Sequence, residues 1–124
     1  MSKVNTDTVF AGSGITFLAR LRGDDGQLIT QASLSGVTVD VWDRSNSDVS
    51  VLSTAVTVTT SVFDTLQTDP RWTADTTGYN FRYDMADTVL SQDNHKYRVE
   101  FWFTPVTGSK FPLVWEISTI ETLK

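Results

Sequence analysis

The chain of 124 residues contains no cysteine and a single histidine, His95. It therefore has no disulfide framework, no thiolate nucleophile, no iron–sulfur cluster and no cysteine-ligated zinc. A single imidazole excludes every catalytic or metal site that needs two. Neither a glycine-rich phosphate loop nor a G-x-S-x-G motif occurs. These absences predict a protein that is not an enzyme and that carries no metal or organic cofactor.

Basic residues are few: ten Lys and Arg stand against fifteen Asp and Glu, and the formal net charge is −5. Such a balance lacks the basic surface that nucleic-acid binding requires. No apolar run approaches the ~20 residues of a membrane-spanning helix. The first ten residues lack the apolar stretch of a secretory signal. We therefore expect neither a nucleic-acid nor a membrane partner.

Strong helix formers are also scarce, with six Ala and three Glu, whereas Thr numbers nineteen and Val fourteen. Thr and Val favour β-strands. Apolar and polar residues alternate through short segments, with a turn signal about every ten residues, the pattern of a β-sandwich. The length suits one domain. The sequence predicts an all-β, antiparallel sandwich of about seven strands, within the segments 15–22, 27–30, 36–42, 49–60, 79–84, 97–104 and 111–118.

Two segments depart from this alternation. Residues 1–14 end in Gly12-Ser13-Gly14 and are interpreted as an extended N-terminal arm, leaving residues 15–124 as the single sandwich domain. The arm is either a frayed terminus or a segment that orders against a neighbouring subunit.

Residues 61–76 have the weakest strand pattern. There Thr68-Asp69-Pro70 resembles a helix start, which predicts one short helical turn near residues 68–73.

The inward faces of the expected strands predict the core. Its members are the apolar residues that alternate with polar ones: Phe17, Leu21, Val39, Val41, Phe81, Val99, Phe101, Leu113 and Trp115. Trp72 is expected to pack the helical turn onto the sandwich. Asp43 and His95 are expected in solvated turns.

Two tryptophans fall on the outward faces of their strands and mark the candidate site. Trp42 and Trp102 are expected to be exposed, and Arg98 and Glu100 alternate with the core on the same strand as Trp102. Large exposed aromatic side chains beside charged ones are typical of a protein interface. A sugar-stacking platform, or coverage of both rings by loops or by the arm, are the alternatives. The arm contributes three apolar residues to the predicted interface: Val4, Val9 and Phe10.

The order of these segments resembles a known group of domains. FLARL, the turn RGDDGQLIT, LSGVTVDVWD, GYNFRYDM and the final HKYRVEFWFTPVTGSKFPLVWEISTI follow one another between Gly14 and Ile120. This pattern resembles the immunoglobulin-like domains of bacteriophage virion proteins, and is similar to the N-terminal domain of phage baseplate upper proteins. The chain departs from that pattern at Gly12-Ser13-Gly14, where G-D-T is common, and in the extra excursion Phe63–Trp72.

The resemblance implies an immunoglobulin-like sandwich that serves as a structural part of the virion: a capsid decoration, neck, tail or baseplate component. Such a protein is made in the host cytoplasm and is located in the virion. Its implied partners are the major capsid, neck or tail proteins and further copies of itself. The alternative function is a carbohydrate-binding module that attaches to the host surface through a glycan.

Overall fold

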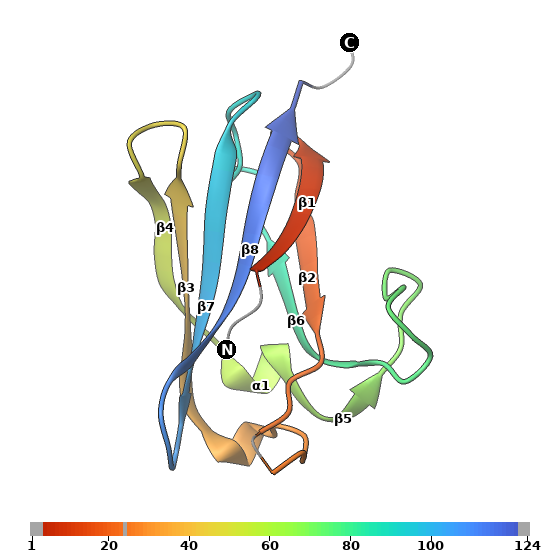
Figure 1. Cartoon of the computed structure of the whole chain (residues 1–124). Helices are drawn as coiled ribbons and strands as arrows, with labels where there is room; N and C mark the ends of the chain where they lie inside the picture. The colour runs from red at the N-terminus through yellow and green to blue at the C-terminus, as the bar shows by residue number, and fades with distance from the viewer. Residues whose placement is uncertain (1–3, 24, 122–124) are drawn as a thin grey trace.

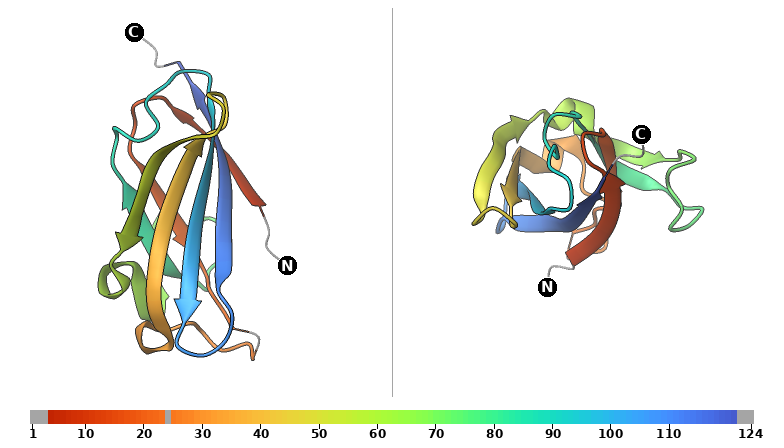
Figure 2. Two further views of the ribbon diagram at one scale, coloured as in Figure 1. Left: turned by 90° about the vertical axis from the view of Figure 1, so that its left-hand side faces the viewer. Right: turned by 90° about the horizontal axis from the view of Figure 1, so that it is seen from above.

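The computed structural model describes residues 4–23 and 25–121, which form two facing β-sheets with the hydrophobic core between them (Figures 1 and 2). A five-stranded sheet has the order β1-β8-β7-β3-β4, and a three-stranded sheet has the order β2-β6-β5. The strands are β1 (Val4–Phe10), β2 (Ile15–Ala19), β3 (Leu34–Asp43), β4 (Val49–Val56), β5 (Val62–Gln67), β6 (Tyr79–Met85), β7 (Lys96–Pro105) and β8 (Phe111–Ile120). Two short helical segments are η1 (Gln31–Ser33) and α1 (Val58–Ser61). The predicted all-β sandwich is confirmed.

The core follows the predicted alternation. Seven of the nine residues expected in the core are buried between the sheets: Phe17, Leu21, Val39, Val41, Phe81, Val99 and Phe101. Leu113 and Trp115 face the same interior from β8, but they are only half-buried. Both line the groove between β2 and β8, which leaves part of each side chain in contact with solvent.

The strand order is that of an immunoglobulin-type sandwich. Tyr97, the second residue of β7, supplies a tyrosine corner: its hydroxyl accepts a hydrogen bond from the Gln92 N–H, 3.1 Å away and five residues upstream. Burial raises the pKa of this hydroxyl. Val99, two residues later in β7, is buried in the core.

The predicted N-terminal arm is wrong for most of its length, because residues 4–10 form a strand of the domain. β1 pairs with β8 in parallel, in a register that runs from Val4 opposite Val114 to Phe10 opposite Ile120. It is the one parallel pair among the described strands. Gly12, with φ of 76°, then lets the chain cross to β2 in the other sheet. Residues 1–3 lie outside the described part of the chain.

The helical turn predicted near residues 68–73 is also wrong. That segment contains a single hydrogen-bonded turn, from the Trp72 N–H to the Asp69 carbonyl. The segment interpreted as least strand-like instead contains β5, and a short α-helix, α1, precedes that strand. Trp72 does pack on the sandwich, with its ring 5.8 Å from that of Tyr79. Within the described residues no helix has the length and apolar character needed to cross a membrane.

Arginine–carboxylate pairs hold the long β5–β6 connection in place. Arg20 lies 2.7 Å from Asp75, whose carboxylate also accepts the Trp72 indole N–H and the Gly78 backbone N–H. The side-chain bond from Arg20, followed by the one from Trp72, lowers the pKa of Asp75 well below its ordinary value of 3.8. The bonds from Arg71 lower the pKa of Asp69 in the same way.

These lowered pKa values predict acid sensitivity in the β5–β6 connection. A carboxylate whose folded-state pKa is lowered contributes its full stability above pH 3.8 and loses it as the pH falls towards the folded-state value. The indole N–H resonance of Trp72 should therefore stay unchanged from pH 7 to about pH 4 and move only at lower pH. Asp75→Asn should move that resonance already at neutral pH. A resonance that titrates together with free aspartate in the unsubstituted protein would contradict this prediction.

Candidate functional site

The predicted site residues of β3 and β7 do gather on one surface, the outer face of the five-stranded sheet. Arg98, Glu100 and Trp102 occupy successive outward positions along β7. Trp42 of β3 lies directly opposite Arg98 in the register of the two strands. Period-two geometry places all four side chains on the face away from the core.

Hydrogen bonds connect these side chains to one another. The Glu100 carboxylate accepts the Arg98 Nε–H at 2.5 Å on one oxygen and the Trp102 indole N–H at 2.9 Å on the other. Glu116 of β8 joins the group, because its Oε1 lies 4.0 Å from an Arg98 nitrogen and 3.2 Å from an Arg44 nitrogen. We call this set the outer-face cluster: Trp42, Arg44, Arg98, Glu100, Trp102 and Glu116.

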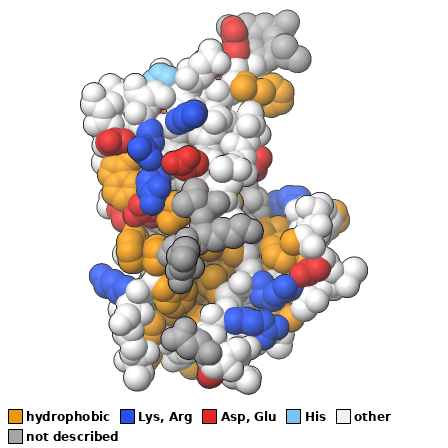
Figure 3. All heavy atoms as spheres, in the orientation of Figure 1, with side chains coloured by type: hydrophobic (Ala, Val, Ile, Leu, Met, Phe, Trp, Pro, Cys, Tyr) orange, Lys and Arg blue, Asp and Glu red, His pale blue; other side chains and the backbone are white. Residues whose placement is uncertain are grey.

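The outer-face cluster is more enclosed than the sequence predicts. Trp42 and Trp102 are half-buried, not exposed. Trp102 is oriented by its hydrogen bond to Glu100. Arg98 is held between the carboxylates of Glu100 and Glu116. Side chains held in this way lose less conformational freedom when a partner covers them. Figure 3 shows acidic, basic and hydrophobic side chains adjacent to one another on the upper part of this sheet.

Two members of the cluster were not predicted, Arg44 and Glu116. Glu116 lies opposite Arg98 in the β7–β8 register, so the pairing of these two strands contained the signal. Arg44 follows β3 in the β3–β4 loop, and its ion pairs with Asp48 and Glu116 depend on how that loop folds back. Sequence alternation carries no information about such a loop.

The predicted interface residues of the N-terminal segment do not join the cluster. Val9 is half-buried and packs against the core. Phe10 is 46% exposed and lies opposite Ile120, which is 41% exposed. The cluster reaches β8 only at Glu116, four residues earlier, so Phe10 and Ile120 form a separate apolar patch at the end of the sheet. The side chain of Val4 lies outside the described part of the structure.

Asp43 and His95 form a pair that the sequence analysis missed. Asp43, at the end of β3, is buried, and His95 is half-buried rather than solvated. The His95 Nδ1 lies 2.8 and 3.0 Å from the two carboxylate oxygens, and the Ser45 N–H donates to the same carboxylate. The pair ties the loop after β3 to the residue before β7. Since neighbouring groups orient Asp43 and its bonds are internal, we assign the pair a structural role.

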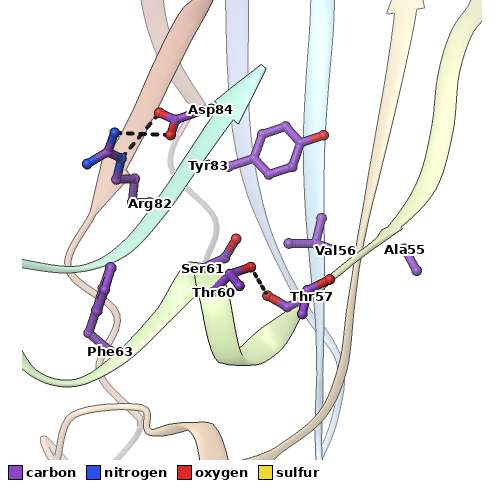
Figure 4. A pocket seen from close by; sticks show the side chains of 9 residues that line it. All are labelled: Ala55, Val56, Thr57, Thr60, Ser61, Phe63, Arg82, Tyr83 and Asp84. Atoms are coloured by element: carbon purple, nitrogen blue, oxygen red, sulfur yellow. Dashed lines mark hydrogen bonds and ion pairs between the residues drawn. The ribbon is translucent and has the colours of Figure 1, made fainter. Parts of the chain in front are cut away.

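Among the open hollows in the described part of the chain, two have apolar side chains in their walls. The larger is a groove of about 1110 Å³ between β2 and β8, with apolar walls that include Leu18, Leu113 and Trp115. Figure 3 shows hydrophobic side chains gathered in the lower half of the molecule. The smaller, of about 430 Å³, lies between the end of β4, α1 and β6. Figure 4 shows Tyr83 extending from β6 towards Val56 of β4 in this second pocket.

Neither of these two hollows is lined by a recognisable set of catalytic groups. In the described part of the chain, no group of three or more His, Cys, Asp or Glu is placed to hold a metal ion. Burial raises the pKa of the Tyr83 hydroxyl, which leaves it protonated at neutral pH. No known family model, curated protein or solved structure matches the chain.

Proposed function

We propose that the chain is a non-enzymatic structural protein of a bacteriophage virion, in the capsid decoration, the neck, or the tail and baseplate. It acts by docking the outer face of its five-stranded sheet on other virion proteins: major capsid, neck or tail proteins. The resemblance of the segments between Gly14 and Ile120 to phage immunoglobulin-like domains suggests the virion. The docking role rests on the outer-face cluster.

The observation that supports docking is the chemistry of that cluster. Trp and Arg are the side chains most enriched among the residues that dominate binding energy at protein interfaces. Here Trp102 and Arg98 share one carboxylate, and Trp42 faces Arg98 across the strand pair. An ion pair that is already formed and half-desolvated costs less to cover than two free charges. A sheet face carrying such a cluster can supply much of the ~800 Å² per partner of a standard interface.

The chain offers a matched pair of variants for the test. Arg98 and Arg71 each form an ion pair with a carboxylate two residues away in the chain. Arg98→Glu reverses a charge in the outer-face cluster, whereas Arg71→Glu makes the same change in the β5–β6 connection. We expect Arg98→Glu to reduce incorporation into purified particles at least about tenfold. Arg71→Glu should incorporate like the unsubstituted chain.

Each outcome is informative. Absence of the chain from purified particles would overturn the virion assignment. Equal incorporation of both variants would overturn the docking surface while leaving the virion assignment in place. If Trp42→Ala and Trp102→Ala instead abolish binding to host polysaccharide, the carbohydrate-binding alternative holds. Thermal unfolding of each variant separates loss of docking from loss of the fold.

A further inference from the structure

The edges of the two sheets differ in how well they are protected from pairing. Among the described strands, β1 and β4 are the edges of the larger sheet, and β2 and β5 those of the smaller. β1 carries Asp7 and β5 carries Asp64, whereas β2 has only five residues. Edge strands normally carry charges, proline or shortened lengths that prevent association with another chain. β4 has eight residues with neither charge nor proline, and most of them are exposed.

The surroundings of β4 share this lack of protection. No charged residue, proline or glycine occurs anywhere between Val49 and Phe63. Val49 and Val51 are 45% and 39% exposed, among the most exposed large hydrophobic residues described. Figure 2 shows β4 at the free side of the five-stranded sheet. The edge therefore presents unpaired backbone groups flanked by apolar and hydroxyl side chains.

We propose that β4 pairs antiparallel with β4 of a second copy of this chain, joining two five-stranded sheets into one across a two-fold axis at Ser53. The inference goes beyond the proposed function, because it adds self-association through a different surface from the outer-face cluster. The two copies of that cluster then lie on one continuous face, so a dimer docks with two sites instead of one.

The register of β4 makes this pairing self-complementary. Residues directly opposite in an antiparallel pair share one face of the sheet. With Ser53 opposite Ser53 of the second copy, Leu52 lies opposite Thr54, and both belong to the inner face through their pairing with Val41 and Val39. The register of β3 with β4 shifts by one residue between Val41 and Trp42, next to Val51. Because that shift leaves Val51 without an opposite residue, Val49 comes opposite Val56 of the second copy, again on the inner face.

A neighbouring pocket fits the same arrangement. Val56 and Ala55 line the hollow between β4, α1 and β6, together with Tyr83 (Figure 4). Because Val49 of the second copy lies opposite Val56, its exposed side chain is placed at the mouth of this hollow. The dimer thus covers, at both ends of the strand pair, an exposed valine and a partly apolar pocket.

Charge does not oppose the pairing, although the chain is acidic. The closest carboxylate on the outer face is Asp40 of β3, which accepts a hydrogen bond from Ser53 at 2.6 Å. The two copies of Asp40 are separated by three strand spacings, about 14 Å. That separation exceeds the Debye length of about 8 Å at physiological salt, so their repulsion is largely screened.

The absence of cysteine from the chain makes a sharp test possible. Opposed residues of an antiparallel pair have Cα atoms about 4.5–5.5 Å apart, within the range that a disulfide spans. Ser53→Cys should therefore form a symmetric disulfide dimer in oxidised glutathione. Ser109→Cys is the control, since Ser109 is an exposed serine in the turn between β7 and β8. We expect Ser53→Cys to cross-link at least about tenfold faster than Ser109→Cys.

Sedimentation velocity of the full chain without cysteine provides the second measurement. The unsubstituted chain should dimerise as its concentration rises. Val51→Lys places a charge on the edge and should raise the dimer dissociation constant at least about tenfold. Val106→Lys makes the same change at a 65% exposed position away from β4 and should dimerise normally. Thermal unfolding shows whether each variant is folded.

Three results would overturn the proposal: a chain that remains monomeric at high concentration, equal cross-linking of the two cysteine variants, or equal loss of dimer in the two lysine variants. None of them affects the docking role of the outer-face cluster, which Arg98→Glu tests separately. Conversely, a dimer that forms through β4 in a chain absent from purified particles would uphold the edge pairing and overturn the virion assignment.

Discussion

Replacing Phe101 by alanine is expected to lower the free energy of unfolding by about 3–5 kcal/mol. Phe101 is fully buried, and its ring lies 5.3 Å from Phe17, 5.0 Å from Phe81 and 5.8 Å from Trp115. These rings come from both sheets, so the truncation leaves a cavity at the place where the sheets are held together. A small domain has a total stability of about 5–15 kcal/mol, of which this is a large part.

Urea denaturation measures the effect, with Phe10→Ala as the matched control. The same atoms are removed there, but Phe10 is 46% exposed at the end of β1 and should lose less than about 1 kcal/mol. If Phe101→Ala does not fold, Phe101→Leu gives a smaller, measurable loss of about 1–1.5 kcal/mol. A Phe101→Ala variant that unfolds at the same urea concentration as the unsubstituted protein would show that the ring is not part of the core.

Asn80→Ala is expected to cost about 2–4 kcal/mol, although it removes no hydrophobic contact. Asn80 is completely buried in β6, and its side-chain amide forms hydrogen bonds with backbone groups of the chain that follows β2. Its Oδ1 accepts the Leu21 N–H at 2.6 Å, while its Nδ2 donates to the carbonyls of Leu21 and Ile29 at 3.1 and 2.8 Å. Alanine leaves all three backbone groups without that partner.

Hydrogen exchange distinguishes this mechanism from general destabilisation. The Leu21 amide should lose its protection in Asn80→Ala, because its acceptor is removed. The amide of Val99, in the centre of β7, should change only as far as global unfolding requires. Asn46→Ala, at an exposed position of the β3–β4 loop, should leave stability within about 0.5 kcal/mol of the unsubstituted protein. Protection of the Leu21 amide that survives Asn80→Ala would contradict this role.

The outer-face cluster was partly predictable because alternation is a local property. Arg98, Glu100 and Trp102 alternate with Val99, Phe101 and Phe103, so the pattern along β7 alone separates the outward set from the core. What alternation cannot predict is how deeply an outward side chain is enclosed. The half-burial of Trp102 depends on Glu100 and on the strands to either side, which only the assembled sheet provides.

The Asp43–His95 pair shows the same limit more strongly. The two residues are 52 positions apart, and each stands in a turn-like segment rich in polar residues. They meet because β3 and β7 are neighbours with Asp43 opposite Tyr97. Turn composition was therefore a misleading guide to exposure at both positions. The interface role of Trp42, Arg98, Glu100, Trp102 and Phe10 stays a prediction.

The fold class follows from local sequence alone, since a chain rich in Thr and Val with period-two alternation favours strands whose apolar faces must pack together. Most of the core follows in the same way, because burial depends on the side of the strand on which a residue lies. That residues 4–10 form β1 is visible only in the folded chain, because their partner β8 lies more than a hundred residues away and neither segment has a sequence signal for parallel pairing. The edge position of β4 is likewise a property of the folded chain, because a strand's own residues do not specify how many neighbours it has.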